Sequence, residues 1–263
     1  MKVLGVIPAR YASTRFPGKP LVNIQGKTMI QRVYEQAMKA KSLSKVIVAT
    51  DDERIFNHIK SFNGEVMMTS NVHQSGTDRC AEVINKLSSE AFDAVVNIQG
   101  DEPFINSSQI DAVVEVLKKE QFMIATLVKR INVDVYANEM QSVIAMDEAN
   151  RVIHNPNIVK AVFSSEGKAL YFSRSPIPYL RNIPAEEWIS KGEFYKHIGL
   201  YAYKSSVLKE IAQLPPSRLE QLESLEQLRW LENGYSIGIA ETDLETIGID
   251  TPEDLLKVKI ENT

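Results

Sequence analysis

Short apolar runs alternate with stretches of helical periodicity through the first part of the chain. The runs are rich in β-branched side chains and have the length of strands, and they cover residues 3–8, 45–50 and 93–99. Between the strands, the spacing of apolar side chains predicts helices over residues 29–40, 52–62 and 77–87. Strands that alternate with helices form a parallel sheet with helices on both faces. The sequence therefore predicts an α/β fold with a mostly parallel central sheet.

The second half of the chain has a less regular pattern. Short strands are predicted over residues 142–146, 158–163, 169–173 and 197–203, with a turn at 164–167. Leucines recur along residues 218–234 and predict one amphipathic helix that stops at Gly234, and the proline-rich stretch 175–188 predicts an extended arm. Thr251 and Pro252 have the residue types of a helix N-cap and first helical position. No repeat or obvious linker divides the chain, so we expect one continuous domain over residues 1–263.

The charge and cysteine content exclude several classes of protein. The 263 residues carry a formal net charge of −4, and the pI is near 5.7, whereas a general nucleic-acid binder usually has a basic excess. Any anion site is therefore expected to be a local basic pocket. Cys80 is the only cysteine, so no internal disulfide can form, and we expect it to be a small buried side chain on a helix. No apolar run reaches membrane-spanning length and no signal peptide is evident, which predicts a cytosolic protein.

The loop "IPARYASTRFPGKP" follows the first predicted strand and places cations among small residues. The cations are Arg10, Arg15 and Lys19, and Ser13 adds a hydroxyl group. Arginine grips phosphate oxygens in a bidentate manner, and lysine adds a point charge. Ligands of parallel sheets bind beyond the carboxyl ends of the strands, where this loop lies. The loop is neither a P-loop nor a GxGxxG motif, so these residues alone suit both a phosphate-binding loop and a solvated surface loop.

The stretch "HQSGTDR" lies just ahead of the third predicted helix. Its residues Ser75, Gly76 and Thr77 can present hydroxyl groups and backbone N–H groups at the helix N-terminus, which is a favourable place for an anion or a polar base. The same residues also suit a plain helix cap with Asp78 in the first turn. This stretch alone leaves both interpretations open.

Two acidic residues occupy similar positions in separate parts of the chain. In "NIQGDEPF", a strand ends at Gln99, Gly100 allows a tight exit, and Asp101 follows. In "IGIDTPEDL", Asp250 stands just before the final helix. Mg²⁺ is commonly held by one or two carboxylates together with substrate phosphates, so the pair suits a Mg²⁺ site. A turn at Asp101 and a helix cap at Asp250 are the alternatives.

Seven stretches occur in an order that is typical of one family. They are "IPARYASTRFPGKPL", "HQSGTDR", "NIQGDEPF", "ALYFSRSPIPY", "HIGLYAY", "LEQLESLEQLRWLENG" and "GIDTPEDL". Over nearly the whole chain they resemble the 3-deoxy-manno-octulosonate (KDO) cytidylyltransferases, also called CMP-KDO synthetases. The glycine-rich GGxGTR-like opening of the nucleotidyltransferases that act on sugar 1-phosphates is absent. The sialic acid cytidylyltransferases lack "ALYFSR" and "LEQLR" in this arrangement.

The resemblance implies both a fold and a reaction. The fold would be a single Rossmann-like nucleotidyltransferase domain with a protruding dimerisation arm at about residues 174–195. The protein would be a cytoplasmic, Mg²⁺-dependent homodimer that transfers CMP from CTP to the anomeric hydroxyl of KDO, an acidic eight-carbon sugar. Pyrophosphate would be released, and the product would serve lipopolysaccharide biosynthesis. Alternatives are the same reaction on 8-amino KDO or sialic acid, and, more remotely, a non-catalytic nucleotide-binding regulatory protein.

The resemblance also implies a role for each matching residue. Phosphate binding is implied for Arg10, Ser13, Arg15 and Lys19, and contacts with cytosine and ribose for Ser75, Gly76, Thr77 and Gln99. Mg²⁺ binding is implied for Asp101 and Asp250, which form the catalytic set together with Arg10 and Lys19. A sugar pocket is implied for Arg174, His197, Tyr201, Glu226 and Gln227, with Arg174 as the partner of the sugar carboxylate. Residues 137–163 receive no role, because this stretch is longer than the family pattern.

Overall fold

The computed structural model describes residues 1–12, 16–132, 142–245 and 248–255. The chain folds into two compact units, each assembled from separate segments. Unit 1 contains residues 1–118, 200–213 and 245–263, and unit 2 contains residues 119–199 and 214–244. The chain therefore passes between the units more than once. The single domain expected over residues 1–263 stays a prediction.

Unit 1 is built on a parallel sheet. Its strands are β1 (Val3–Ala9), β4 (Lys45–Thr50), β5 (Val66–Met68) and β6 (Ala94–Asn97), in the order β6-β1-β4-β5. Residues 201–204 of β10 (Phe194–Lys204) pair antiparallel with β6. The three strands predicted in this half are confirmed. Nearly all residues of β1, β4 and β6 are buried, which explains their continuous apolar runs, since a parallel sheet has both faces covered.

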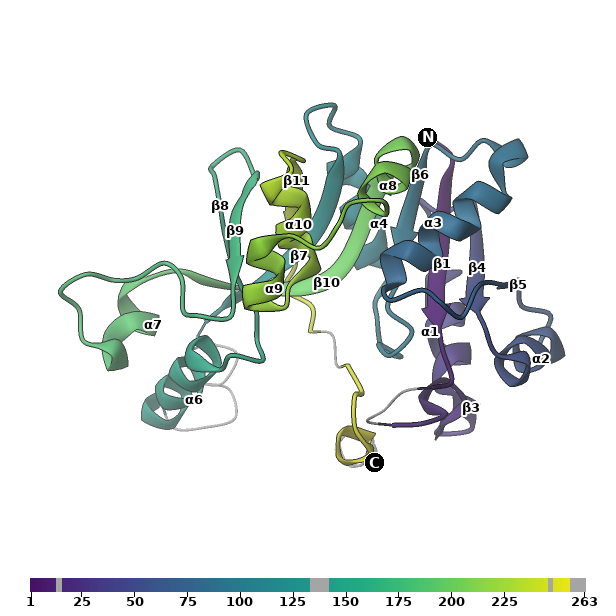
Figure 1. Cartoon of the computed structure of the whole chain (residues 1–263). Coiled ribbons are helices and arrows are strands. Elements are labelled where there is room, and N and C mark those ends of the chain that lie inside the picture. Colours follow the sequence, from purple (N-terminus) through teal and green to yellow (C-terminus); the bar gives the residue numbers. More distant parts are fainter. Residues whose placement is uncertain (13–15, 133–141, 246–247, 256–263) are drawn as a thin grey trace. The chain divides into compact units, whose positions relative to one another are not determined.

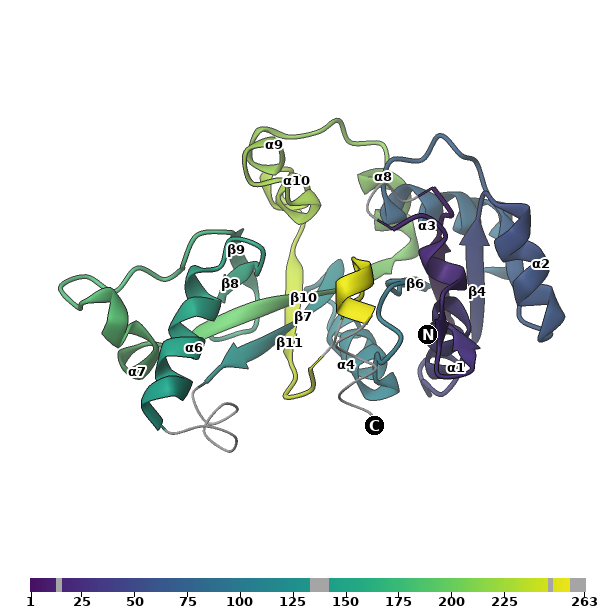
Figure 2. The same cartoon turned by 90° about the horizontal axis from the view of Figure 1, so that it is seen from below.

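Helices cover both faces of the unit 1 sheet. Figure 2 shows α3 and α8 on one side and α1 and α4 on the other, with α2 at the edge beside β4 and β5. The helices are α1 (Met29–Ala37), α2 (Glu53–Ser61), α3 (Gly76–Lys86), α4 (Ser107–Leu117) and α8 (Ser205–Ile211). The short elements are η1 (Lys19–Leu21), β2 (Asn23–Ile24), β3 (Lys27–Thr28) and η2 (Ser88–Glu90). The helices predicted at 29–40, 52–62 and 77–87 are thus confirmed, and Cys80 is buried on α3 as expected.

Unit 2 combines a parallel strand pair with an antiparallel hairpin (Figure 1). The parallel pair is β7 (Ile124–Ile131) and β11 (Ile237–Glu241). The hairpin is β8 (Lys160–Phe163) and β9 (Ala169–Ser173), and β8 also pairs with β10. The helices are α6 (Ser142–His154), α7 (Trp188–Lys191), α9 (Arg218–Glu223) and α10 (Glu226–Glu232), with η3 at Ala185–Glu187. The strands predicted at 158–163, 169–173 and 197–203 and the turn at 164–167 are confirmed.

Two predictions of secondary structure in unit 2 are wrong. Residues 142–146 were predicted to be a strand, but they open α6, because a short apolar run cannot be distinguished from a helical segment by periodicity. The helix predicted over 218–234 is broken into α9 and α10 by Ser224, which has the left-handed value φ 51°. The backbone N–H of Arg174 and the hydroxyl of Ser173 both bind the Glu223 carboxylate at this break. Tertiary contacts therefore fix the end of α9. The predicted stop at Gly234 is confirmed, with φ +81°.

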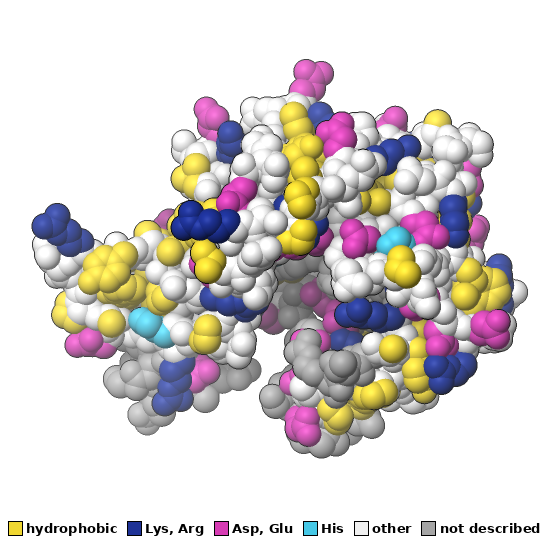
Figure 3. Space-filling model, viewed as in Figure 1, with side chains coloured by type: hydrophobic (Ala, Val, Ile, Leu, Met, Phe, Trp, Pro, Cys, Tyr) yellow, Lys and Arg dark blue, Asp and Glu magenta, His cyan; other side chains and the backbone are white. Residues whose placement is uncertain are grey.

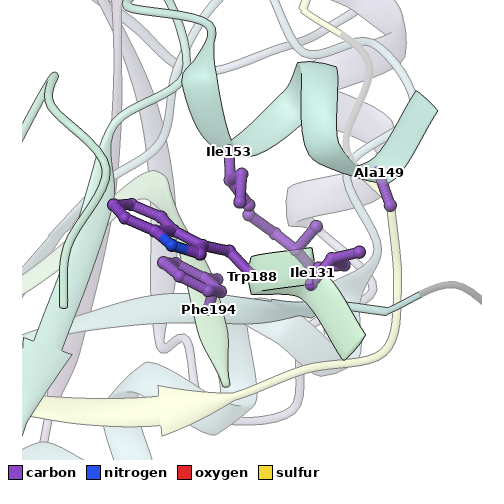
Figure 4. Packing of buried hydrophobic residues seen from close by; sticks show 6 residues of the cluster. Ile131, Ala149, Ile153, Trp188 and Phe194 are labelled. Carbon is purple, nitrogen blue, oxygen red and sulfur yellow. The ribbon is translucent and has the colours of Figure 1, made fainter. Parts of the chain in front are cut away.

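The predicted arm is anchored at its C-terminal end inside unit 2. Most of residues 175–184 lack regular structure, as expected, and η3 and α7 follow. Figure 4 shows the Trp188 ring lying over Phe194, and their rings are stacked with centroids 6.1 Å apart. Ile131 and Ile153 belong to the same buried cluster. This cluster stabilises the base of the arm, while a role of residues 174–195 in dimerisation stays a prediction.

The surface carries both signs of charge. On the face drawn in Figure 3, lysine and arginine side chains are interspersed with aspartate and glutamate side chains. This distribution fits the expectation that anion binding requires a local pocket. Within the described part of the chain, no helix has the length and apolar character needed to cross a membrane.

Candidate active site

A cavity of about 230 Å³ lies in unit 1, at the carboxyl ends of β1 and β6. This edge of a parallel sheet is where ligands bind in open α/β folds. The cavity brings together seven of the residues predicted from the sequence, which are Arg10, Lys19, Ser75, Gly76, Gln99, Asp101 and Asp250. The predicted phosphate-binding residues Ser13 and Arg15 lie outside the described residues.

Lys19 forms ion pairs with both predicted metal ligands. Its Nζ lies 2.8 Å from Oδ2 of Asp101 and 3.1 Å from Oδ1 of Asp250. The backbone reinforces this meeting, because the N–H of Ile249 donates to the carbonyl of Asp101 at 3.0 Å. Residues that are far apart in the sequence therefore meet at one edge of the sheet, as the sequence predicted.

The two carboxylates fit a Mg²⁺ ion by their chemistry and their spacing. Both are oxygen donors, which Mg²⁺ prefers, and both already contact a single cationic group. No group of three or more His, Cys, Asp or Glu side chains suited to a metal occurs among the described residues. Asp101 and Asp250 would hold the ion here, and phosphate oxygens and water are the other ligands that Mg²⁺ commonly takes. Mg²⁺ binding stays a prediction.

The N-terminus of α3 forms one wall of the cavity. Ser75 caps the helix: its Oγ accepts the N–H of Asp78 at 3.1 Å, and its own N–H donates to Oδ2 of Asp78 at 3.1 Å. The capping interpretation is therefore confirmed. Ser75 and Gly76 nevertheless line the cavity, where the partial positive charge of the helix end favours an anion or a polar base. Thr77, by contrast, is buried and lies outside the cavity lining.

Gly100 makes the tight exit from β6 that the sequence predicted. A Cβ atom at this position would lie 2.7 Å from the carbonyl oxygen of Pro8, which is too close for any side chain. The absence of a side chain lets the chain turn against β1 and places Gln99 and Asp101 in the cavity lining. The geometry of the site therefore depends on this glycine.

The cavity lining includes residues to which the sequence assigned no role, and Arg79 is one of them. Arg79 is 4% exposed, its Nη1 donates to Oγ1 of Thr69 at 2.5 Å, and its Nη2 lies 3.5 Å from Oδ2 of Asp51. It stands one turn after Gly76 on α3, and this i, i+3 spacing was the signal that could have placed it on the cavity side. His73 also lines the cavity.

The His73 ring is fixed by a polar cluster on α3. Its Nε2 contacts the Glu82 carboxylate, which also accepts the N–H of Ser70 and the ammonium of Lys86. Burial raises the pKa of Glu82, but these hydrogen bonds outweigh burial and lower the pKa to about 2. Glu82 is therefore ionised at neutral pH and can hold the imidazole of His73 in one orientation.

Arg174 is held by main-chain carbonyls in unit 2. Its Nε donates to the carbonyl of Glu223 at 2.6 Å, Nη1 to that of Pro156 at 2.9 Å, and Nη2 to that of Ser224 at 3.2 Å. A guanidinium has five N–H donors, so these three bonds still allow a contact with a carboxylate. The structure thus gives Arg174 a bracing role, and its binding of the sugar stays a prediction.

A lysine with no role predicted from the sequence, Lys160, holds the backbone at Arg174. Lys160 is fully buried, and its Nζ donates to the carbonyls of Asn155, Ile158 and Arg174 at 2.9, 2.6 and 2.6 Å. Burial and the charge of Arg174 lower the pKa of Lys160 to about 8. Lys160 and Glu223 together position the main chain of Arg174.

His197 is neutral and has a defined hydrogen-bond partner. Burial lowers its pKa to about 3. The Thr126 hydroxyl donates to the carbonyl of Ile198 at 3.1 Å and lies 2.9 Å from Nε2 of His197. Because the hydroxyl has one hydrogen, it must accept from His197, so the proton of the imidazole is on Nε2.

The remaining predicted sugar residues lie on α10 and β10. Glu226 and Gln227 open α10 in unit 2, and Gln227 is buried. Tyr201 belongs to unit 1, where its ring stacks on Tyr203 with centroids 6.0 Å apart. The grouping of these residues with Arg174 and His197 in one pocket stays a prediction.

Comparisons with known proteins give a consistent result. The family described as Cytidylyltransferase matches residues 4–242. A 3-deoxy-manno-octulosonate cytidylyltransferase of Parabacteroides distasonis is 54% identical over 98% of this chain and 96% of its own length. The enzyme of the same name from Bacteroides thetaiotaomicron is 55% identical over 97% of this chain and 96% of its own.

Solved structures support the same relationship. A CMP:2-keto-3-deoxy-manno-octonic acid synthetase in complex with CTP aligns with a TM-score of 0.85 and 40% identity, covering 100% of this chain and 98% of that one. A cytidylyltransferase from Leptospira borgpetersenii aligns with a TM-score of 0.59 and 17% identity over 100% of this chain and 88% of that one, a likeness that concerns the fold alone.

Proposed function

Because this chain belongs to the cytidylyltransferase family, among its 3-deoxy-manno-octulosonate cytidylyltransferases, we propose that it transfers CMP from CTP to KDO. The anomeric hydroxyl oxygen of the sugar attacks the α-phosphorus of CTP and loses its proton. The bond from the α-phosphorus to the bridging oxygen of the β-phosphate breaks, so the products are CMP-KDO and pyrophosphate. CMP-KDO is the activated sugar for lipopolysaccharide biosynthesis.

The meeting of Lys19, Asp101 and Asp250 in one cavity carries this proposal. The reaction joins two anions, a sugar acid and a triphosphate, so the protein must place positive charge between them. The cavity supplies Arg10 and Lys19 for this purpose, together with two carboxylates that suit a divalent cation. No covalent nucleophile is required, because positioning and charge stabilisation are sufficient for phosphoryl transfer.

In this mechanism, Lys19 pairs first with the two carboxylates and then with the triphosphate of CTP. Its ammonium forms ion pairs with Asp101 and Asp250. When CTP binds, Lys19 moves to the triphosphate, where Arg10, Ser13 and Arg15 are the other proposed contacts. Asp101 and Asp250 would then be the residues that hold Mg²⁺. When bound, Mg²⁺ supplies Lewis-acid stabilisation of the charge at the α-phosphate.

Ser75, Gly76 and Gln99 are the proposed contacts of the cytosine and ribose. They line the same cavity as the cations, so a bound nucleotide can reach both groups. Thr77 supports them from its buried position on α3. Cytosine has a donor where uracil has an acceptor, and the wrong base would leave a polar group of the site unpaired at a cost of about 1–3 kcal/mol.

Arg174, His197, Tyr201, Glu226 and Gln227 are the proposed sugar-binding residues. Arg174 would bind the sugar carboxylate with the N–H donors that the main-chain carbonyls do not use. Lys160 and Glu223 fix the main chain of Arg174, so the guanidinium starts from a defined position. This prior ordering lowers the entropic cost of binding.

We further propose that the protein acts in the cytoplasm, where CTP is available, and that it is a homodimer. The arm at residues 174–195 is the proposed contact between subunits. Tyr179 of the arm is 75% exposed, and its ring makes an edge contact with Trp188. An exposed aromatic side chain on an anchored segment suits a protein interface.

A pyrophosphate-release assay with a panel of nucleotides and sugars tests the proposal. We expect release with CTP and KDO, and little release with UTP or with sialic acid. Release with 8-amino KDO in preference to KDO would identify the amino sugar as the substrate. Nucleotide binding with no release for any sugar would contradict the proposed enzyme and favour a regulatory nucleotide-binding protein.

A further inference from the structure

Asn97 is a buried polar residue at the end of β6 whose role the mechanism does not explain. It is 4% exposed, and its Oδ1 is buried with no hydrogen-bond partner among the described residues. The large majority of buried side-chain polar atoms in native proteins are paired, so an unpaired one requires an explanation. Leaving such a group unpaired destabilises the folded protein.

The carboxamide of Asn97 lies directly behind the wall of the nucleotide cavity. A Cβ atom added to Gly76 would lie 3.2 Å from Nδ2 of Asn97, 3.4 Å from its Oδ1, and 3.4 Å from Cγ of Pro8. Both Gly76 and Pro8 line the cavity. Gly76 therefore presents only backbone atoms to Asn97, because a larger residue at position 76 would crowd the carboxamide.

The register of the sheet fixes the position of Asn97. It pairs with Val6 of β1 on one side and with Tyr201 of β10 on the other. Strands β1 and β10 hold the backbone of Asn97 from both sides, so its position is fixed before a ligand binds. The carboxamide thus holds a donor and an acceptor at one fixed place in the sheet.

We propose that Asn97 is a nucleoside-binding residue of this enzyme, whose carboxamide hydrogen-bonds the cytidine part of CTP. This inference rests on the proposed function. A neutral carboxamide has both a donor and an acceptor, as the base edge and the ribose hydroxyls do, whereas the phosphates are matched by Arg10 and Lys19. The unpaired oxygen in the free protein is then a cost of folding that nucleotide binding offsets.

Asn97→Leu tests the proposal, because leucine has nearly the shape of asparagine and no polar atoms. Calorimetry should show about tenfold or greater loss of affinity for CTP and for CMP. Tripolyphosphate, which lacks the nucleoside, should bind as it does to the wild type. The melting temperature without ligand should stay the same or rise, since an unpaired buried polar group has been removed.

Ser205→Ala is the matched control. Ser205 lies in the same unit, and its Oγ is also buried with no hydrogen-bond partner among the described residues, but it begins α8, whereas Asn97 lies against Gly76 of the cavity wall. This variant should leave the affinities for CTP and CMP unchanged. Asn97→Ala provides the same comparison of CTP with tripolyphosphate if the leucine variant does not fold.

Unchanged CTP affinity in the Asn97 variants would overturn the inference, as would an equal loss for CTP and tripolyphosphate. A lower melting temperature with unchanged CTP affinity would assign Asn97 a purely structural role. These results are distinguishable from failure of the proposed function, which would appear as absent CTP binding or absent pyrophosphate release in the wild type.

Discussion

Replacing Lys19 with methionine should strengthen Mg²⁺ binding to the free protein while it weakens catalysis. The ammonium of Lys19 occupies both carboxylates, at 2.8 Å from Asp101 and 3.1 Å from Asp250. A cation that binds these oxygens must first displace it. Methionine keeps much of the length of the side chain and removes the competing charge.

The size of the effect follows from the exposure of the three groups. The side chains of Lys19, Asp101 and Asp250 are 13%, 32% and 45% exposed, so solvent screens their interaction substantially. Exposed ion pairs contribute about 0.2–1 kcal/mol each, and two contacts therefore amount to about 0.4–2 kcal/mol. Mg²⁺ should accordingly bind about 2- to 30-fold more tightly to the Lys19→Met protein. Turnover should fall about a hundredfold or more, because the triphosphate loses a cation.

Titration calorimetry of Mg²⁺ without nucleotide, together with turnover at saturating CTP and KDO, measures both effects. Lys27→Met is the control, since Lys27 forms a surface ion pair with Glu35 in the same unit and is absent from the cavity lining. It should change neither quantity. Weaker Mg²⁺ binding in Lys19→Met would refute the competition, and unchanged turnover would refute the role of Lys19 at the triphosphate.

Three further predictions concern the carboxylates, the sugar site and the pH dependence of stability. Asp101→Asn and Asp250→Asn should each lower turnover at least a hundredfold and raise the Mg²⁺ concentration for half activity, and the double variant should be little worse; near-normal turnover in both single variants would exclude the metal site. Arg174→Ala should weaken KDO binding by about 2–4 kcal/mol in calorimetry with little change for CTP, whereas an unchanged KDO affinity would leave it only its bracing role. The pKa of His197 is lowered to about 3 from 6.5, so its stabilising contribution is present above pH 6.5 and is lost as the pH falls towards 3. Between pH 7.5 and 5 the free energy of unfolding should fall by about 2 kcal/mol more in the wild type than in His197→Gln, as measured by denaturant unfolding, and parallel curves would argue against an imidazole that stays neutral in the folded protein.

The parallel sheet of unit 1, and the edge of this sheet that carries the candidate active site, could be predicted from the sequence for a physical reason. Buried parallel strands are continuous apolar runs, and loops at their carboxyl ends meet by topology, so Asp101 and Asp250 could be placed together. Residues whose conformation depends on tertiary contacts show no such pattern in the sequence. The left-handed Ser224 depends on the contacts of Glu223 with β9, which no local pattern reveals.

The burial of two cationic side chains could not be predicted from the sequence either. Arg79 and Lys160 have the residue types of surface positions, yet they are 4% and 0% exposed. Each is held by hydrogen bonds to partners from other segments, including Thr69 for Arg79 and the carbonyl of Arg174 for Lys160. A single sequence shows the residue type but not the partners, so it could not show that these cations are buried.

The transfer itself is tested most directly by following one oxygen atom. KDO that carries ¹⁸O at its anomeric hydroxyl is incubated with CTP and Mg²⁺, and the products are analysed by mass spectrometry. Attack of this hydroxyl on the α-phosphorus predicts that the label appears in the bridging oxygen of CMP-KDO and that pyrophosphate is unlabelled. Label in the pyrophosphate, or CTP that is bound and left intact, would contradict the account.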